Sequence, residues 1–556
     1  MMDPEALQIL HGVLGCVALL LLLVASMPVA FAMALVGAVG IWSLSGLPAA
    51  MFTLGSELGT NFGNGSLTVI PLFILMGQVA FHSGISGRLF EAAYRWLGAL
   101  PGGLAMATVG ACTGFGAICG SGPATAATMA AVALPEMRRR NYSMELASGA
   151  VAAGGSLGMM IPPSVVFIVY GIMTEQSPGK LFIAGILPGL LLAVLFCLTI
   201  YMNCVRHPEQ GPASPPFSWR ERLTALAGVG ETMALFTLVI GGMFGGLFTP
   251  VEAAAVGAAG SIALAVARRQ LSLRAFRRSL LETARTSCMV MMIVAGAMIF
   301  GRFLTATSLP IKLADALASL PLPSAMVMGG IIFFYLFAGC FVDALALILL
   351  TVPVFYPVVV KLGYDPIWFG VIIVVVTQMG VISPPVGVNV YVVSGIARDI
   401  PLQTVFKGAL PFLGALVVGS VLLILFPEVC LYLPTRGPAG MAALAAVGGL
   451  ALVQAGALLH GGRAFGIAGA DYGRASMVVL TRLALVQGIF AHVPDRGLTT
   501  WVAAGLFSLL TGIVLTKLVC RASWRRAAAA WGVAALTWVA LAWAAATQGY
   551  DLSHLF

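Results

Sequence analysis

The chain has 556 residues, of which 60% are hydrophobic and only 9% are charged, and its mean hydropathy is +1.02. A water-soluble protein carries about 25% charged residues, so this composition excludes a soluble globular fold. Apolar runs close to the roughly 20 residues that cross a bilayer recur along the chain, whereas the alternating segments of a membrane β-barrel are absent. We therefore predict an all-α polytopic membrane protein.

The formal net charge of +9 indicates what kind of partner the chain binds. In a soluble protein it would suggest nucleic acid, but in a membrane protein it is typical of basic cytoplasmic loops. We expect the lipid bilayer as the surrounding and no nucleic-acid partner. The first apolar run, 7–24, lacks the basic flank and the small-residue cleavage site of a signal peptide. It is therefore predicted to be a retained span. The nine cysteines lie mostly in apolar runs without metal-ligand spacing and are interpreted as buried hydrophobes.

Hydropathy along the chain predicts a series of membrane spans. They fall at 7–26, 28–47, 66–83, 145–172, 183–204, 226–247, 250–267, 284–304, 366–396 and 408–427. Two further apolar stretches, 103–134 and 326–360, are interrupted near their middles and are predicted to be re-entrant hairpins. The amphipathic segments 86–101 and 310–323 are predicted to lie in the interface plane. A C-terminal extension, 436–556, carries candidate spans at 438–459, 475–491, 499–519 and 528–547.

An internal repeat with an offset of 222 residues organises these segments. Several prolines align at this offset, including Pro28 with Pro250 and the Pro162–Pro163 pair with Pro384–Pro385. We predict two copies of one unit, 1–205 with hairpin 103–134 and 225–427 with hairpin 326–360, joined by the polar linker 206–224. Each copy would cross the membrane five times, an odd number, so the second copy would be inverted relative to the first, as in many transporters.

The positions of the basic residues support this topology. With the N-terminus in the periplasm, all but six of the 29 Lys and Arg fall on or near the cytoplasmic face, including the clusters 138–140, 268–278 and 521–526. The six exceptions are Lys180, Arg302, Lys312, Lys361, Arg436 and Arg496. This is the positive-inside bias of a correct orientation, so a periplasmic N-terminus is predicted.

Four breaks interrupt the apolar helices. The hairpins bend at 116–128 and 339–351, and single spans break at the double prolines of 158–164 and 380–389. Unpaired backbone groups at bilayer depth are costly unless protein, water or a ligand satisfies them. Free carbonyls suit a hard cation such as Na⁺, and helix N-termini suit a carboxylate. Each hairpin tip and its broken span are therefore predicted to form one half-site near the midplane.

Side chains at the breaks offer further oxygen atoms. They belong to Ser121, Thr125, Ser164, Ser383 and Asn389. Asp343 is an acidic residue inside an apolar hairpin, which makes it a functional candidate by default. For the Ser and Thr hydroxyls, a hydrogen bond back to their own helix is the alternative explanation.

At these breaks the sequence resembles the large membrane subunit (M subunit, DctM-like) of tripartite ATP-independent periplasmic (TRAP) transporters. The similar stretches span roughly 10–427 and include "FGAICGSGPATAAT" (115–128), "IPPSVVFIVYG" (161–171), "GGLFTPVEAAAVG" (245–257) and "ISPPVGVNVYVVSGIA" (382–397). The resemblance implies an elevator-type, Na⁺-driven importer of a small organic acid, often a C4-dicarboxylate, in the bacterial inner membrane. It also implies two partners, a periplasmic solute-binding protein and a small four-helix membrane subunit.

The resemblance also implies the site residues. By motif, two Na⁺ positions fall at the two pairs of breaks, with the substrate between them. The implied cation-binding residues are Gly116, Gly120, Ser121, Thr125, Gly158, Pro162, Ser164, Gly339, Asp343, Gly380, Ser383, Pro384 and Asn389. The implied substrate-binding residues are Ser121, Gly122, Pro163, Ser164, Pro385, Gly387 and Asn389. No cofactor is implied besides Na⁺ as the coupling ion.

Other functions fit the sequence less well. A primary pump would need a nucleotide motif, and no G-x-x-x-x-G-K-[ST] occurs. In a membrane-embedded enzyme Ser121 would need a histidine base, but the six histidines lie at span ends or in loops, so we predict no enzyme. A Na⁺–carboxylate symporter that needs no binding protein remains an open alternative. The solute, the Na⁺ stoichiometry, the oligomeric state and the role of the extension also stay open.

Overall fold

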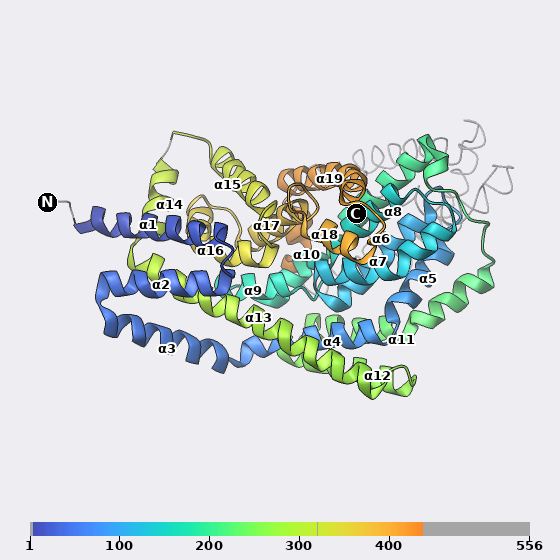
Figure 1. Ribbon diagram of the computed structural model, residues 1–556, viewed down its shortest axis with the longest axis horizontal. Coiled ribbons are helices and arrows are strands. Elements are labelled where there is room, and N and C mark those ends of the chain that lie inside the picture. Colours follow the sequence, from blue (N-terminus) through green and yellow to red (C-terminus); the bar gives the residue numbers. More distant parts are fainter. Residues whose placement is uncertain (1–3, 320, 437–556) are drawn as a thin grey trace, which may run out of the picture. The chain divides into compact units, whose positions relative to one another are not determined.

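The computed structural model describes residues 4–319 and 321–436 of the chain (Figure 1). The chain divides into two compact units, 1–434 and 435–556, and the spans predicted within 436–556 lie outside the described residues. The described part is helical and contains no β-strand, as the composition predicts. Seven of its helices are long and apolar enough to cross a membrane: Leu7–Val24, Gly65–His82, Pro178–Arg206, Pro250–Ala267, Leu273–Ala306, Ala344–Lys361 and Leu402–Leu425.

The helices of the described chain form two series in sequence order. The first series is α1 (Pro4–Val24), α2 (Val29–Ser45), α3 (Leu47–Gly63), η1 (Gly65–Thr68), α4 (Val69–His82), α5 (Ile85–Leu97), α6 (Gly103–Cys119), α7 (Gly122–Arg139), α8 (Met144–Ser156), η2 (Leu157–Met159), α9 (Val165–Met173) and α10 (Pro178–Arg206). After η3 (Pro208–Gln210), the second series is α11 (Trp219–Phe244), α12 (Pro250–Ala267), α13 (Leu273–Ala306), α14 (Leu309–Ser319), α15 (Ser324–Gly339), α16 (Ala344–Lys361), α17 (Pro366–Gly380), α18 (Val388–Ile396) and α19 (Leu402–Leu425).

The second series repeats the first, element by element, from the amphipathic helix onward. Helix α7 spans Gly122–Arg139 and α16 spans Ala344–Lys361, so both ends are shifted by 222 residues. Each hairpin is followed by a short helix, a break and another short helix: α8 and α9 in the first series, α17 and α18 in the second. The peptide bonds Pro162–Pro163 and Pro384–Pro385 are both cis. The repeated proline pattern therefore corresponds to a repeated order of helices.

Several helix starts follow from capping residues in the sequence. Ser218 with Glu221, and Thr249 with Glu252, form capping boxes at the starts of α11 and α12. The Asp365 carboxylate accepts hydrogen bonds from the backbone N–H of Ile367 (2.7 Å) and Trp368, and Pro366 follows it in the first turn of α17. Local chemistry thus determines where these helices begin.

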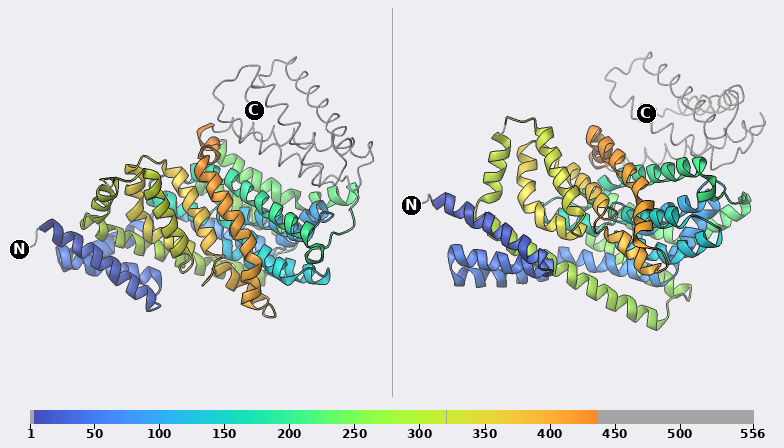
Figure 2. Two further views of the ribbon diagram at one scale, coloured as in Figure 1. Left: turned by 90° about the horizontal axis from the view of Figure 1, so that it is seen from above. Right: turned by 45° about the horizontal axis from the view of Figure 1, so that its top comes forward.

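Helix α3 is an element that the hydropathy does not predict. It packs beside α2 and α13, and α1, α2 and α3 lie side by side (Figures 1 and 2). In the second series, most of the residues equivalent to α3, η1 and α4 lie in one continuous helix, α13. The difference arises at Asn64, whose extended backbone ends α3 and whose side chain accepts a hydrogen bond from Ser66 N. Asn-Gly favours a turn, whereas the equivalent Thr286-Ser287 does not break the helix.

Ion pairs between distant segments connect loops that are predicted to lie on the same side of the membrane. Arg302 forms an ion pair with the buried Glu57 of α3, at 2.7 Å, and Lys361 pairs with Asp315. The sequence topology places all four of these residues near the periplasmic face. Arg138 pairs with Asp399, and both belong to loops predicted on the cytoplasmic face. In the described part of the chain, these long-range ion pairs therefore join loops that the topology places together.

The linker 206–224 is fastened to neighbouring loops. Gly211 O accepts a hydrogen bond from Gly102 N, and Gln210 O accepts one from Ser143 N, both at 2.9 Å. The Tyr142 hydroxyl donates to Pro212 O (2.9 Å) and accepts from Leu104 N (3.1 Å). Burial raises the pKa of Tyr142 to about 12, so the hydroxyl keeps its proton, and with it the bond to Pro212 O, to a higher pH than an exposed tyrosine would.

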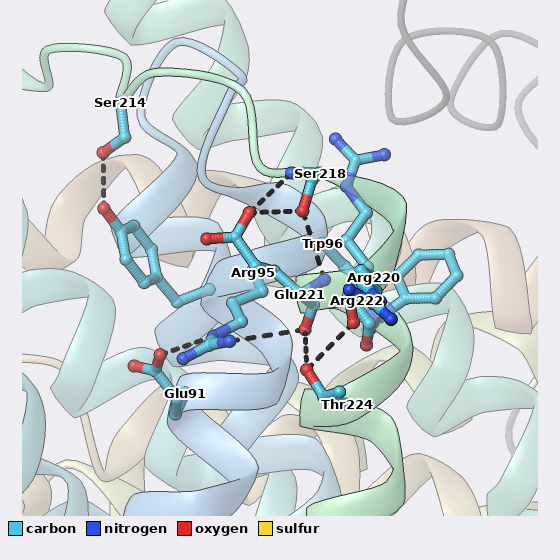
Figure 3. A network of polar contacts seen from close by, with 10 residues as sticks. Glu91, Arg95, Trp96, Ser214, Ser218, Arg220, Glu221, Arg222 and Thr224 are labelled. Atoms are coloured by element: carbon cyan, nitrogen blue, oxygen red, sulfur yellow. Dashed lines mark hydrogen bonds and ion pairs between the residues drawn. The ribbon is translucent and has the colours of Figure 1, made fainter.

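Figure 3 shows how the end of this linker meets helix α5. Arg95 donates to Glu91 on its own helix (2.7 Å) and to the backbone oxygen of Glu221. The Glu221 carboxylate accepts from Ser218 N at 2.7 Å. The linker that connects the two series is therefore folded, and its end contacts α5.

Candidate functional site

The first predicted half-site is a contact between the tip of the α6–α7 hairpin and the break between α8 and α9. We call this contact the first junction (116–125 with 158–165). Gly120 has a φ of +65°, and a Cβ there would lie 2.4 Å from Pro163 O, so only glycine fits the tip. The Gly120 carbonyl accepts a hydrogen bond from Val165 N at 3.4 Å. The tip and the break therefore touch through their backbones, close enough to share a ligand.

Hydroxyl groups at the first junction are bonded to backbone oxygens. Thr125 Oγ1 donates to Ser121 O at 2.8 Å, and Ser164 Oγ donates to Met159 O at 2.5 Å. Both side chains are buried. Ser164 also begins α9, where its oxygen accepts from Phe167 N. These bonds hold the hydroxyl oxygens in place, and each oxygen keeps a lone pair with which a cation can be bound.

The second junction (339–343 with 380–389) has the same layout. A Cβ on Gly380 would lie 2.3 Å from the carbonyl carbon of Gly339. Val386 N donates to Cys340 O at 3.3 Å. The tip and the break of the second series are thus also in contact.

Two polar side chains at the second junction have local hydrogen bonds. Ser383 Oγ donates to Met379 O at 2.6 Å. Asp343 precedes α16, and its carboxylate accepts from Leu345 N at 3.1 Å. The Asp343 residue is exposed. Its carboxylate therefore caps a helix N-terminus and still presents oxygen atoms to the outside of the tip.

Asn389 connects the second junction to α8, the helix that leads into the first junction. It follows Gly387, whose φ of +58° begins α18. Its backbone N–H donates to Val381 O, and its side-chain Nδ2 donates to Ala152 O in α8 of the first series, both at 3.0 Å. Helix α18 packs on α7 and α8. The amide oxygen of Asn389 is buried without a partner among the described residues, so it is an acceptor available to a ligand.

Gln378 is a candidate that the sequence reasoning does not identify. It is fully buried in α17, two residues before Gly380. Neither its amide nitrogen nor its amide oxygen has a partner in the described part of the chain. Buried amides are normally hydrogen-bonded, so this one has capacity for a ligand or a water. The signal in the sequence is a polar amide within the apolar run "VIIVVVTQMG".

An apolar pocket lies beside the first junction. Its lining includes Ile118 and Pro163 together with Phe236, Val239 and Leu264 from α11 and α12. Apart from the hydroxyl groups of Thr232 and Ser261 the lining is apolar, and it holds no charged side chain, so an ion would be poorly solvated there. We therefore place the candidate site at the polar atoms of the two junctions and not in this pocket.

A family model described as "Tripartite ATP-independent periplasmic transporter, DctM component" matches residues 16–429. The chain belongs to this family. The resemblance expected from the motifs is thereby confirmed, and the match ends close to the end of α19. The family consists of transport permeases, which confirms that this DctM component is not an enzyme.

Curated relatives carry the same type of name. The DctM component is 38% identical over 388 residues to the C4-dicarboxylate TRAP transporter large permease protein DctM of Pseudomonas aeruginosa, covering 70% of this chain and 90% of that one. It is 34% identical over 414 residues to the sialic acid TRAP transporter large permease protein SiaM of Vibrio cholerae, covering 74% and 96%. The chain is therefore a multi-pass transport permease.

Two further similarities differ in what they cover. The isethionate TRAP transporter permease protein DctMQ of Oleidesulfovibrio alaskensis is 36% identical over 408 residues, which is 73% of this chain and 63% of that protein. The crystal structure of the Alcanivorax borkumensis YdaH transporter superposes with a TM-score of 0.52 at 18% identity, covering 69% of this chain and 90% of that one. At this identity the match bears on the fold alone.

Proposed function

We propose that this DctM component imports a small organic acid across the bacterial inner membrane by secondary transport coupled to Na⁺. A periplasmic solute-binding protein delivers the solute, and a small four-helix membrane subunit accompanies the permease. The two junctions bind Na⁺ and the solute and move together as the elevator. No cofactor besides Na⁺ takes part.

The observation that carries this proposal is the contact of Asn389, in the second junction, with α8, the helix that leads into the first junction. The Asn389 side chain donates a hydrogen bond to Ala152 O in α8 at 3.0 Å. Carbonyl and hydroxyl oxygens at each junction suit Na⁺. Among the described residues, the buried amide oxygen of Asn389 and the buried amide of Gln378 have no hydrogen-bond partner, so each has capacity for a polar guest. Sites at discontinuous helices related by a repeat are typical of secondary transporters.

The names of the relatives narrow the class of solute. They are named for C4-dicarboxylate, sialic acid, isethionate and ectoine. The first three carry a net negative charge, and their anions match the start of α9, because helix N-termini favour negative charge and the capping residue there is the neutral Ser164. We therefore propose an organic anion as the solute and place its acidic group toward this helix start.

Uptake by the full chain in proteoliposomes tests the proposal. Radiolabelled C4-dicarboxylate, sialic acid, isethionate and ectoine are supplied with or without a purified binding protein and an inward Na⁺ gradient. We expect uptake of one acid only when both are present. Uptake without the gradient would contradict Na⁺ coupling, and uptake without the binding protein would indicate a symporter that works alone.

Asp343→Asn tests the cation site within this proposal. The amide oxygen can still cap α16, but the charge is lost, so we expect half-maximal uptake to need about tenfold more Na⁺. Asp315→Asn is the matched control, because Asp315 is exposed and pairs with Lys361 away from both junctions. An unchanged Na⁺ titration of Asp343→Asn would remove this residue from the site.

A further inference from the structure

The start of α13 and the turn before it are strongly basic. Between positions 268 and 285 the chain has six arginines and one glutamate. Arg274, Arg277, Arg278 and Arg285 are all exposed, and their spacing of three, four and seven residues places them on one face of the helix. We call these four residues the arginine stripe.

The opposite face of this helix segment is buried. Ser279, Thr283 and Ser287 lie on it, and Ser279 Oγ contacts His82 Nδ1 at 3.1 Å and Gln78 O at 3.4 Å, both in α4. The arginine stripe therefore points away from the helices that α13 packs against.

Few acidic groups face the arginine stripe. Arg278 pairs with Glu282 at 3.0 Å, while Arg274, Arg277 and Arg285 have no carboxylate partner among the residues that the structure describes. From the amphipathic helix α5, the Arg88 guanidinium donates a hydrogen bond to Gln270 in the turn before α13 at 2.6 Å. The surface is therefore short of negative charge.

The length of α13 places this surface beside the lipid headgroups. Its 34 residues extend about 51 Å at 1.5 Å per residue, whereas the hydrocarbon core is about 30 Å thick. The stretch 286–301 is free of charged residues, so the surplus length lies mostly at the arginine end. Next to the stripe, Leu281 is 56% exposed and lies between Arg278 and the uncharged stretch. Guanidinium groups on the outer side of an exposed leucine match the boundary between headgroups and acyl chains.

We propose that the arginine stripe binds the phosphodiester headgroups of anionic phospholipids in the adjacent leaflet. Guanidinium groups bind phosphate oxygens in a bidentate manner, and the exposed Leu281 contacts the acyl chains of the same lipids. Each basic residue near an anionic surface contributes on the order of a fivefold gain in binding. The proposal concerns lipid binding and does not depend on which solute the chain transports.

Native mass spectrometry of the purified full chain with added dioleoylphosphatidylglycerol and dioleoylphosphatidylcholine tests the proposal. We expect the native chain to retain the anionic lipid at least tenfold more than the zwitterionic one. The triple variant R274Q/R277Q/R278Q should lose most of this preference, and R274K/R277K/R278K should keep part of it because it retains the charge. Equal retention of both lipids by the native chain would overturn the proposal.

The matched control is R138Q/R139Q/R140Q, which removes the same charge from another basic cluster. These arginines already contact Asp399, Glu136 and the ring of Tyr94, so their loss should leave the lipid preference unchanged. An equal loss in both triple variants would indicate a general effect of charge and overturn a specific site. Displacement of the lipid by equimolar glycerol phosphate would identify a site for soluble phosphates and overturn the lipid assignment.

Discussion

The two junctions share one layout but differ in exposure. At the first junction Gly120, Pro162, Pro163 and Ser164 are all buried. At the second, the equivalent Pro384 and Pro385 are exposed, and so are Asp343 and Phe341 at the tip. The repeat thus places the same backbone break in two environments, one covered and one open.

The cover on the first junction comes from elsewhere in the chain. Side chains of α4, α11 and α12 surround Ile118 and Pro163, and α6 packs on both α4 and α8. Under the proposed function the difference in exposure between the two junctions has a role, because alternating access needs one gate to be open while its repeat-related partner is closed. A local motif alone does not decide which break is covered.

The largest expected effect is that of Gly120→Ala at the first tip. The new Cβ would meet Pro163 O at 2.4 Å with a φ of +65°, so we expect a loss of about 3 kcal/mol of stability and little folded protein. Val342 occupies the equivalent position of the open tip, and Val342→Ala should cost less than about 1 kcal/mol. Thermal unfolding in detergent measures both. Equal losses would contradict the difference in packing.

Next in size is Asn389→Ala, which removes the bond between the second junction and α8. Because Asn389 is fully buried and donates to Ala152 O, we expect a loss of about 2 kcal/mol. Ser394→Ala in the same helix is the control, since its 3.2 Å bond to Ile400 O is only part-buried, and it should cost less than half as much. If the two variants unfold at the same temperature, the contact of Asn389 with α8 does not stabilise the fold.

Thiol labelling compares the exposure of the two tips. Cys119 and Phe341 are equivalent in the repeat, but Phe341 is 52% exposed and Cys119 is less accessible. In a chain whose other cysteines are replaced, we expect Phe341→Cys to react with a polar maleimide about tenfold faster than Cys119, a ratio that corresponds to roughly 1.4 kcal/mol. Similar rates would show that both tips are equally open.

The smallest effect on stability is expected at Gln378. Its repeat equivalent, Ser156, donates to Ala153 O at 2.7 Å, whereas the Gln378 amide has no partner among the described residues. Gln378→Leu should therefore stay within about 1 kcal/mol of the native stability while uptake falls, and Ser156→Ala should lose about 1 kcal/mol. A Gln378→Leu chain that unfolds early would indicate a structural role for this amide.

The sequence predicted the elements that depend on local pattern. Hydropathy and proline spacing located the hairpins and the double-proline breaks, and the structure begins α16 and α17 where the repeat places them. Helix α3 was missed because its residues are too polar and glycine-rich for a hydropathy signal. It is positioned by packing against α2 and α13 and by the ion pair of Glu57 with Arg302, which no local pattern encodes.

The candidate site was predictable only in part. The sequence predicted the positions of the breaks. It also indicated that they bind something, because backbone groups without hydrogen bonds inside an apolar span are costly unless they find a partner. It did not show that Asn389 reaches Ala152, 237 positions away, or that the Gln378 amide is left unpaired.

The sequence by itself determined that this chain is a helical membrane permease with a repeated pattern of breaks. The length of the apolar runs, the positions of the prolines and the bias of the basic residues are properties of the local sequence, and their effects do not depend on which helices pack together. Only the tertiary structure decided which break is covered, which amides are unpaired and which arginines face outward. Those depend on contacts between residues far apart in the chain, and many different packings are compatible with the same local pattern.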